Sequence, residues 1–421
     1  MGPRRILILG AMLAACGGTT ASDASVDGSI LDAGDAGAGD AGAADAGAGD
    51  AGAGDSGASD AATDSGAGTD AGSDAGSDAG PADAGLACVR GEWRFSVVDS
   101  SGDVGTDTSI ALEGGRVHLA YRHAGLQELR HAEGPPLGPW STTVVDTEGN
   151  VGRFAALAVD GAGGVWVSYR DATRFELRVA HRPSGGVFAS ERVDTGGEHS
   201  SIALDPAGGV HVAFYRNSAN ELAYAYRAPA ATTWALTTID SSVFDVGIDT
   251  SIGLDSTGGI HVAYYDVTDS DLRYATKPAG GSFGYTTLRS AGGVGRATSI
   301  AIDRFDGVHL SNLDASDLAY AYRPAGGSFA FEVVDGGDVG LSGTSLVVDS
   351  FGAQHIVYSD TTLAALRYAY RAPLGPWTRA TVDDSASVGT FASLAVDAGG
   401  GVHVSYYDAT NGDLRYAYRC P

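Results

Sequence analysis

The sequence predicts an all-β fold, a seven-bladed β-propeller with four-stranded antiparallel blades. Each repeat contains four short segments rich in Val, Tyr, Thr and Ile, bounded by Gly, Asp or Pro. A period of 46 to 49 residues with four such segments is typical of propeller blades. A right-handed β-helix is the main alternative, but its coils are usually shorter and lack four strands per turn. The aromatic residues that begin the repeats are Trp93, Trp140, Phe188, Trp234, Phe283, Phe329 and Trp377.

Residues 1–15 are typical of a secretory signal peptide. Arg4 and Arg5 precede a short apolar run that ends in small residues. The segment 13–17, Leu-Ala-Ala-Cys-Gly, resembles the lipobox of bacterial lipoproteins, and the resemblance implies that Cys16 becomes a lipidated N-terminus. Gly17 after the cysteine is compatible with sorting to the outer membrane. An ordinary signal peptide with an incidental cysteine is the alternative. We expect an exported chain that contacts the membrane only through this lipid.

Residues 16–87 are predicted to form a disordered linker. Between positions 17 and 86 the chain is almost wholly Asp, Ala, Gly, Ser and Thr, with fourteen aspartates and no Lys, Arg or Glu. Such a segment cannot bury enough apolar surface to offset its ordering entropy. It lacks the ligand order and closing glutamate of an EF-hand loop. The net charge of −26 also excludes a basic surface for nucleic acid.

The order of segments within the repeat indicates how the ring closes in the domain 88–421. Small-residue segments such as 250–255 suit the crowded innermost strand, and the aromatic-led segment suits the outer strand. The domain begins with an outer strand (93–99) and ends with strands one to three (392–419), so one blade is built from both chain ends. Cys88 and Cys420 both fall at the position of the missing hairpin loop. We therefore expect a Cys88–Cys420 disulfide and an oxidising compartment.

A histidine recurs on the second strand of six repeats. Each lies in its own blade, so the six rings are too widely spaced to converge on one metal ion. Hydrogen bonding to the Asp of the adjacent turn, for example His211 with Asp205, explains them better. The acidic loop 266–271 is explained by hairpin-turn chemistry rather than by Ca²⁺. We expect no metal and no cofactor. The six are His118, His211, His261, His309, His355 and His403.

Residues 204–212 and their copies, with the Tyr-Tyr-Asp of 264–266 and the Asp-Leu-Arg-Tyr of 271–274, resemble the Asp-box superfamily of propellers, which includes sialidases and propeller lectins. The resemblance covers residues 92–419. The Asp-box has one residue between its Asp and its Gly, whereas the repeats here have two. The aromatic residue that ends the Asp-box is usually replaced by His here, and only Trp166 restores it. A sialidase would need an arginine triad and a Tyr–Glu pair. Only Arg153, Arg296 and Glu198 lie near the expected place.

The connections that enter the innermost strands vary most between repeats, and we expect them to surround the mouth of the central channel. We predict a monomeric, non-enzymatic envelope protein whose propeller is a scaffold for protein or peptide partners, because no motif for nucleophilic, metal or phosphate chemistry is present. A carbohydrate-binding lectin is the alternative. A sialidase-like glycosidase would require Arg153, Glu198 and Arg296 to converge. The candidate binding residues are Asp107, Arg153, Phe154, Glu198, His199, Asp249, Arg296 and Phe391.

Overall fold

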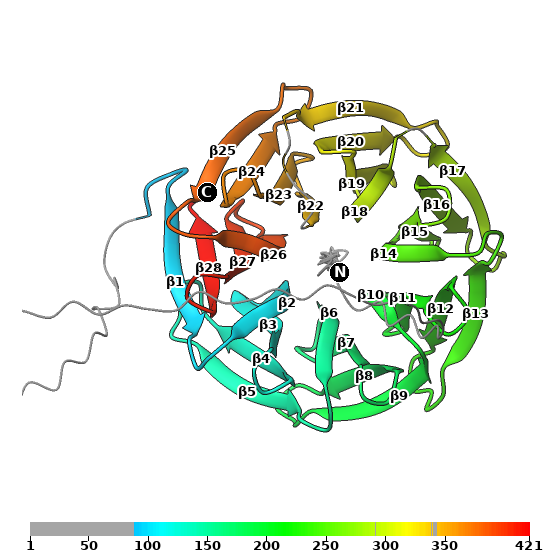
Figure 1. Ribbon diagram of the computed structural model, residues 1–421, viewed down its shortest axis with the longest axis horizontal. Coiled ribbons are helices and arrows are strands. Elements are labelled where there is room, and N and C mark those ends of the chain that lie inside the picture. The colour runs from blue at the N-terminus through cyan, green and yellow to red at the C-terminus, as the bar shows by residue number, and fades with distance from the viewer. Residues whose placement is uncertain (1–87, 291, 338, 340–342) are drawn as a thin grey trace, which may run out of the picture. The chain divides into compact units, whose positions relative to one another are not determined.

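Seven four-stranded antiparallel sheets form a closed ring in the computed structural model (Figure 1). The structure describes residues 88–421 except 291, 338 and 340–342. The predicted signal peptide, Cys16 and the linker lie outside the described residues. Within the described part, no helix has the length and apolarity needed to cross a membrane. The predicted fold class is confirmed.

Each blade runs from an innermost strand near the ring axis to an outer strand at the circumference (Figure 1). The innermost strands are β2 (Val104–Glu113), β6 (Val151–Val159), β10 (Glu198–Leu204), β14 (Val246–Leu254), β18 (Val294–Ile302), β22 (Thr344–Val348) and β26 (Val388–Val396). The second strands are β3 (Arg116–His123), β7 (Val165–Asp171), β11 (Val210–Arg216), β15 (Ile260–Asp266), β19 (Val308–Asp314), β23 (Gln354–Asp360) and β27 (Val402–Asp408). The third strands are β4 (Glu128–Gly134), β8 (Glu176–Arg182), β12 (Glu221–Arg227), β16 (Asp271–Lys277), β20 (Asp317–Arg323), β24 (Ala365–Arg371) and β28 (Asp413–Arg419). The outer strands are β5 (Ser141–Asp146), β9 (Ala189–Thr195), β13 (Ala235–Asp240), β17 (Gly284–Arg289), β21 (Ala330–Asp335), β25 (Thr378–Asp383) and β1 (Trp93–Asp99).

Both ends of the domain build the blade that closes the ring. Its strand order is β1-β28-β27-β26, and β1 pairs antiparallel with β28, with Trp93 opposite Arg419. The Cys88–Cys420 disulfide joins residues 332 positions apart, with their Cα atoms 5.7 Å apart. The predicted phase of the repeat and the predicted disulfide are confirmed. A disulfide agrees with export to an oxidising compartment.

Small residues on the innermost strands join neighbouring blades. The Ser251 hydroxyl accepts the Ile300 N–H at 3.1 Å, and Ser299 accepts the Leu346 N–H at 3.0 Å. Four further boundaries repeat this bond, with Ser109, Ser201, Ser345 and Ser393 as acceptors. The apolar clusters likewise combine side chains from adjacent sheets, such as Leu222 of β12 with Tyr264 of β15. The core therefore lies between the blades, which explains why a closed ring is needed to bury it.

Five of the six repeated histidines hold their own blade together. In each, Nε2 lies 2.9–3.2 Å from the Asp of the preceding turn, as for His211 and Asp205. Nδ1 of the same ring lies 2.5–2.7 Å from a tyrosine hydroxyl of the third strand, such as Tyr224. The expected structural role is thus confirmed for these five. His118 has different partners.

We expect the domain to lose stability as the pH falls below about 6.5. Burial lowers the pKa of His211 and His261 despite their aspartate partners, so the unfolded chain takes up these protons more readily than the folded one. For Asp205 and Asp255, burial raises the pKa, but hydrogen bonds from Gly209 and His211, and from Thr257 and Gly259, outweigh it. A further loss therefore follows below about pH 4.

Urea unfolding at a series of pH values measures this dependence. The double variant His211→Gln with His261→Gln is expected to have a flatter curve between roughly pH 5 and 7. An unchanged curve in that variant would show that these two rings are not responsible.

Aspartates at the ends of six outer strands tie a blade to the next one. Asp240 of β13 accepts hydrogen bonds from Tyr264 of β15 at 2.8 Å and from Arg273 of β16 at 2.9 Å. Asp383 likewise accepts the Tyr406 hydroxyl at 2.6 Å. We call this arrangement the blade tie. It accounts for the repeated tyrosine and arginine of the second and third strands.

Candidate functional site at one end of the ring axis

A residue with left-handed backbone lies near the start of six innermost strands, where the pairing with the second strand is irregular. The φ angles at these positions lie between 49° and 55°. The irregularity is a β-bulge, which turns a strand locally and redirects its side chains. Five of the eight predicted binding residues occupy these positions, and Arg153, Glu198 and Arg296 directly precede them. The six bulge residues are Asp107, Phe154, His199, Asp249, Ala297 and Phe391.

Two buried carboxylates link neighbouring bulges. Asp107 accepts the Phe154 N–H at 2.8 Å, and Asp249 accepts the Ala297 N–H at 2.8 Å. Burial raises the pKa of Asp107, although the Phe154 N–H and nearby cations oppose it. Burial also pushes the pKa of Asp249 upward, but contact with His199 and the Ala297 N–H outweigh it and lower that pKa. Asp249 therefore remains ionised at neutral pH.

His199 lies between a carboxylate and an aromatic ring. Its Nδ1 is 3.1 Å from Oδ1 of Asp249, and its ring is 4.3 Å from the Phe154 ring, centroid to centroid. The hydroxyl of Ser200 donates to the Phe154 carbonyl at 3.0 Å. Because Nδ1 lies beside Asp249, Nε2 is the ring nitrogen that remains for a ligand.

Three arginines gather beside these bulges, and we call Arg122, Arg153 and Arg170 the arginine group. Arg153 of β6 pairs across its sheet with Arg170 of β7, and Arg122 lies on β3 of the adjacent blade. Burial lowers the pKa of both Arg122 and Arg170, and the Arg153 cation lowers each further. Arg153 is exposed. Sequence reasoning missed Arg122 and Arg170, although the strand register places both beside predicted residues.

Arg122 and Arg170 already have partners, so Arg153 is the cation of the group that a ligand can reach. Arg122 donates to the Asn150 side chain at 2.9 Å, and Arg170 is paired with Glu198. The Nε–H groups of Arg122 and Arg170 are buried without a partner among the described residues. Asp107 and Asp103 act on Arg122, and Glu198 acts on Arg170, so carboxylates partly balance the cations of the group.

Of the other predicted residues, Glu198 contacts this group through Arg170, whereas Arg296 does not join it. Glu198 accepts hydrogen bonds from Arg170 and from Asn217, at 2.8 Å for the latter. Arg296 lies on β18, three blades from β6, with its guanidinium 5.3 Å from the Tyr265 ring. The structure thus shows no contact that joins Arg153, Glu198 and Arg296, which a sialidase-like site required.

Phe391 belongs to the blade that closes the ring, which adjoins the blade of Arg122. Its ring packs edge-on against Tyr407 at 6.3 Å, and the Tyr407 hydroxyl donates to Asp103 at 2.7 Å. The aromatic side chains at this end of the axis therefore come from several blades.

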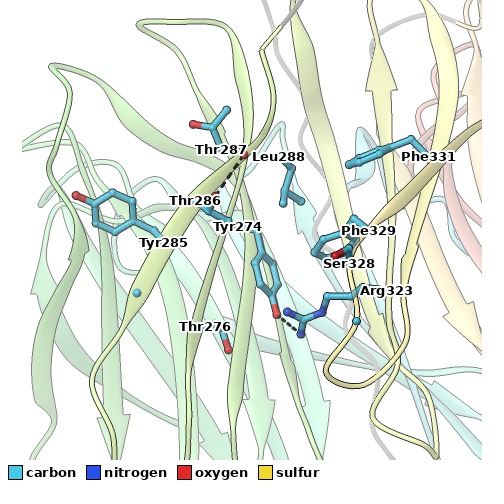
Figure 2. Close-up of a pocket in the computed structure, with 12 residues that line it drawn as sticks. Tyr274, Thr276, Tyr285, Thr286, Thr287, Leu288, Arg323, Ser328, Phe329 and Phe331 are labelled. Carbon is cyan, nitrogen blue, oxygen red and sulfur yellow. Dashed lines mark hydrogen bonds between the residues drawn. The ribbon is translucent and has the colours of Figure 1, made fainter.

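A separate groove of about 490 Å³ lies between two blades, next to outer strands β17 and β21 (Figure 2). Tyr274 and Phe329 pack edge-on, and Arg323 donates to the Tyr274 hydroxyl at 2.8 Å. Tyr285 and Phe331 are partly exposed at its sides. The same Arg–aromatic packing recurs at other boundaries, for example where Arg371 covers Tyr320 and Trp377. The floor of this groove is therefore part of the packing between blades.

One arginine contacts the acidic loop 266–271, which contains three aspartates. Arg273 lies 2.8 Å from Asp266 and 3.8 Å from Asp269. Asp266 also accepts the backbone N–H of Asp269, as in an ordinary turn. This arrangement fits the turn chemistry expected from the sequence.

Solved structures similar to this chain share the propeller fold at low sequence identity. The polysaccharide lyase Uly1 is 10% identical with a TM-score of 0.51, over 76% of this chain and 90% of the lyase. The leech intramolecular trans-sialidase is 12% identical with a TM-score of 0.45, over 78% of this chain and 70% of the enzyme. The fucose-specific lectin of Aleuria aurantia is 13% identical with a TM-score of 0.48, over 67% of this chain and 98% of the lectin. No protein-family model matches the chain. No curated protein matches it either.

These comparisons correct two expectations. The sequence predicted a scaffold for protein or peptide partners and no enzymatic activity. The similar structures are instead a polysaccharide lyase, sialidases and fucose lectins. The comparisons therefore contradict both predictions. The physical reason is that motif searches assume catalytic residues close in sequence, whereas a propeller assembles a site from several blades. At this identity the likeness to the polysaccharide lyase Uly1 shows a shared fold alone.

Proposed function

We propose that this propeller binds an acidic carbohydrate at the end of the ring axis where the arginine group lies. The observation that carries the proposal is the gathering of Arg122, Arg153 and Arg170 beside Phe154 and His199. Guanidinium groups bind carboxylates through paired, charge-assisted hydrogen bonds. Aromatic side chains suit the apolar faces of sugar rings. A uronic-acid oligosaccharide combines these two chemistries.

Replacing Arg153 by alanine is expected to weaken binding of a uronic-acid tetrasaccharide about 10- to 100-fold, because one charge-assisted hydrogen-bond pair is lost. Arg153 is exposed and forms no ion pair with another described residue, so the fold should tolerate the change. Calorimetric titration of the purified full-length chain measures the effect.

Two control variants separate this site from other surfaces. Arg192→Ala removes a half-exposed arginine on β9, and Phe331→Ala alters the groove between blades. Both should leave binding unchanged. Equal affinity for a neutral tetrasaccharide would contradict the proposal, as would a loss of binding confined to Phe331→Ala.

The contact between His199 and Asp249 favours a second candidate function, β-elimination of the bound uronate. His199 would take the proton from C5 through Nε2 while the arginine group stabilises the negative charge that develops on the carboxylate. A double bond then forms between C4 and C5, the C4–O bond breaks, and the departing oxygen receives a proton from water. Asp249 would stabilise the imidazolium.

The His199→Gln variant distinguishes binding from elimination. We expect it to retain binding of the uronic-acid tetrasaccharide but to produce no unsaturated sugar, measured by ultraviolet absorbance and mass. If the unaltered chain binds the tetrasaccharide and leaves it intact, the elimination is wrong and the binding proposal stands.

We further infer that Cys16 carries the lipid that anchors the chain to the bacterial envelope, in the outer membrane. The resemblance of residues 13–17 to a lipobox supports this, and the Cys88–Cys420 disulfide agrees with export. In a bacterial host, labelled fatty acid should enter the unaltered chain and not the Cys16→Ser variant. Equal labelling of both would refute the anchor.

A further inference from the structure

One blade replaces the repeated His–Asp–Tyr contact with a different set of side chains. Where four other blades place two tyrosines on the third strand against the second-strand histidine, β4 carries His131 and Glu133. The preceding turn contains Glu113, Gly114 and Gly115, and supplies no aspartate to the His118 ring. The requirements of the repeat therefore do not explain this combination.

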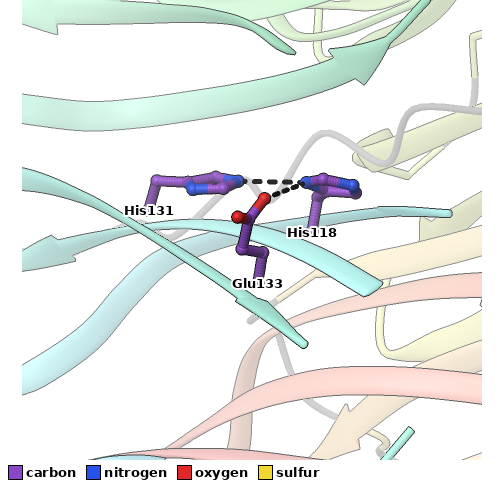
Figure 3. Close-up of side chains that lie close together, drawn as sticks. All are labelled: His118, His131 and Glu133. Atoms are coloured by element: carbon purple, nitrogen blue, oxygen red, sulfur yellow. Dashed lines mark hydrogen bonds and ion pairs between the residues drawn. The ribbon is translucent and has the colours of Figure 1, made fainter. Parts of the chain in front are cut away.

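The three side chains face one another (Figure 3). Nδ1 of His118 lies 3.3 Å from Nε2 of His131 and 3.4 Å from Oε2 of Glu133. The three ligand atoms all lie within 4.8 Å of one another. A tetrahedral ion with ligands at about 2.1 Å places its ligand atoms about 3.4 Å apart. Two edges of such a tetrahedron are thus already present.

We propose that His118, His131 and Glu133 bind a divalent transition-metal ion, with Zn²⁺ as the probe that fits two imidazoles and one carboxylate. This site is independent of the proposed carbohydrate site, since it lies toward the opposite end of β3 from Arg122. Three protein ligands leave one position of a tetrahedron for water or another ligand.

Both rings are suited to donate a lone pair. His118 is 3% exposed and His131 is fully buried. Burial lowers the pKa of both rings, and Arg182 and Arg116 lower it further, whereas Glu133 raises that of His118. His118 Nε2 and His131 Nδ1 have no partner among the described residues. Each would carry the ring proton when the other nitrogen binds the metal.

Two arginines set the expected affinity. Arg182 donates to Oε2 of Glu133 at 2.7 Å, and Arg116 lies 3.4 Å from Oε1. A metal ion must compete with Arg182 for the Glu133 carboxylate. In addition, His118 Nε2 and His131 Nδ1 have no hydrogen-bond acceptor among the described residues that would make the metal-binding nitrogens more basic. We therefore expect micromolar rather than nanomolar binding of Zn²⁺.

The test uses the full-length chain stripped of metal and titrated with Zn²⁺, with Co²⁺ absorption as a second readout of tetrahedral geometry. His131→Tyr is the key variant, because it restores the tyrosine that five other blades place against their histidine and should fold normally. This variant also keeps the aspartates of the linker, so it controls for weak binding of Zn²⁺ to those side chains.

We expect one equivalent of Zn²⁺ per unaltered chain, binding at least about tenfold weaker in His131→Tyr. In Arg182→Gln binding should be severalfold tighter, an outcome that a merely structural role would not produce. Equal binding by the unaltered chain and His131→Tyr would overturn the proposal. So would an Arg182→Gln variant that binds as weakly as His131→Tyr.

Discussion

Replacing Arg273 by alanine is expected to lower the free energy of unfolding by about 3–5 kcal/mol. Arg273 donates to Oδ2 of Asp240 at 2.9 Å in the preceding blade and lies 2.8 Å from Oδ2 of Asp266 in its own. Both carboxylate side chains are fully buried. Without the guanidinium, two anions remain buried without their countercharge, which costs far more than the loss of one hydrogen bond. Urea unfolding at pH 7 measures the change.

Arg192→Ala is the matched control for this prediction. Arg192 lies on the outer strand β9 and contacts Glu176 at 3.5 Å, but its side chain is 53% exposed. An exposed pair contributes about 0–1 kcal/mol, so this variant should unfold almost like the unaltered chain. Similar losses in the two variants would mean that the blade tie does not hold the ring together.

The blade tie shows that a sequence repeat identifies recurring residues but not their contacts in neighbouring blades. Its tyrosine and arginine recur in the sequence at the period of the repeat. Their partner is the aspartate of the preceding outer strand, which periodicity alone cannot identify. One blade boundary lacks the tie: Arg289 stands in place of the outer-strand aspartate, and Ala319 in place of the arginine. Arg289 lies instead 2.5 Å from Asp314, which corresponds to Asp266.

The sequence predicted where the candidate site lies but not all of the residues that form it. Topology placed the strand entrances at one end of the axis, and the structure brings Asp107, Phe154 and His199 together there. Arg122 and Arg170 were missed because they lie on second strands, where the neighbouring positions serve packing. The difference at His118 was also missed, because its histidine fits the repeat while its partners, His131 and Glu133, do not.

Removing the disulfide by Cys88→Ser with Cys420→Ser is expected to lower the free energy of unfolding by about 2–5 kcal/mol. The bond closes a loop across a separation of 332 residues, so in the chain-entropy model it restricts the unfolded chain strongly. The native ring keeps its other closure, since β1 still pairs with β28 and the Cys420 N–H still donates to the Glu92 carbonyl. Thermal and urea unfolding measure the loss.

This prediction separates two roles that the disulfide can have. If it acts through the unfolded chain, the double variant binds ligands like the unaltered chain and differs from it mainly in the midpoint of unfolding. A reducing agent then lowers the midpoint of the unaltered chain but not that of the double variant. If the bond instead holds β1 in place, the native state itself changes. Near-ultraviolet circular dichroism of Trp93, which packs edge-on against Tyr368 of the adjacent blade, would then weaken before unfolding begins. We expect the first result, because strand pairing along the whole of β1 remains when the two sulfur atoms are removed.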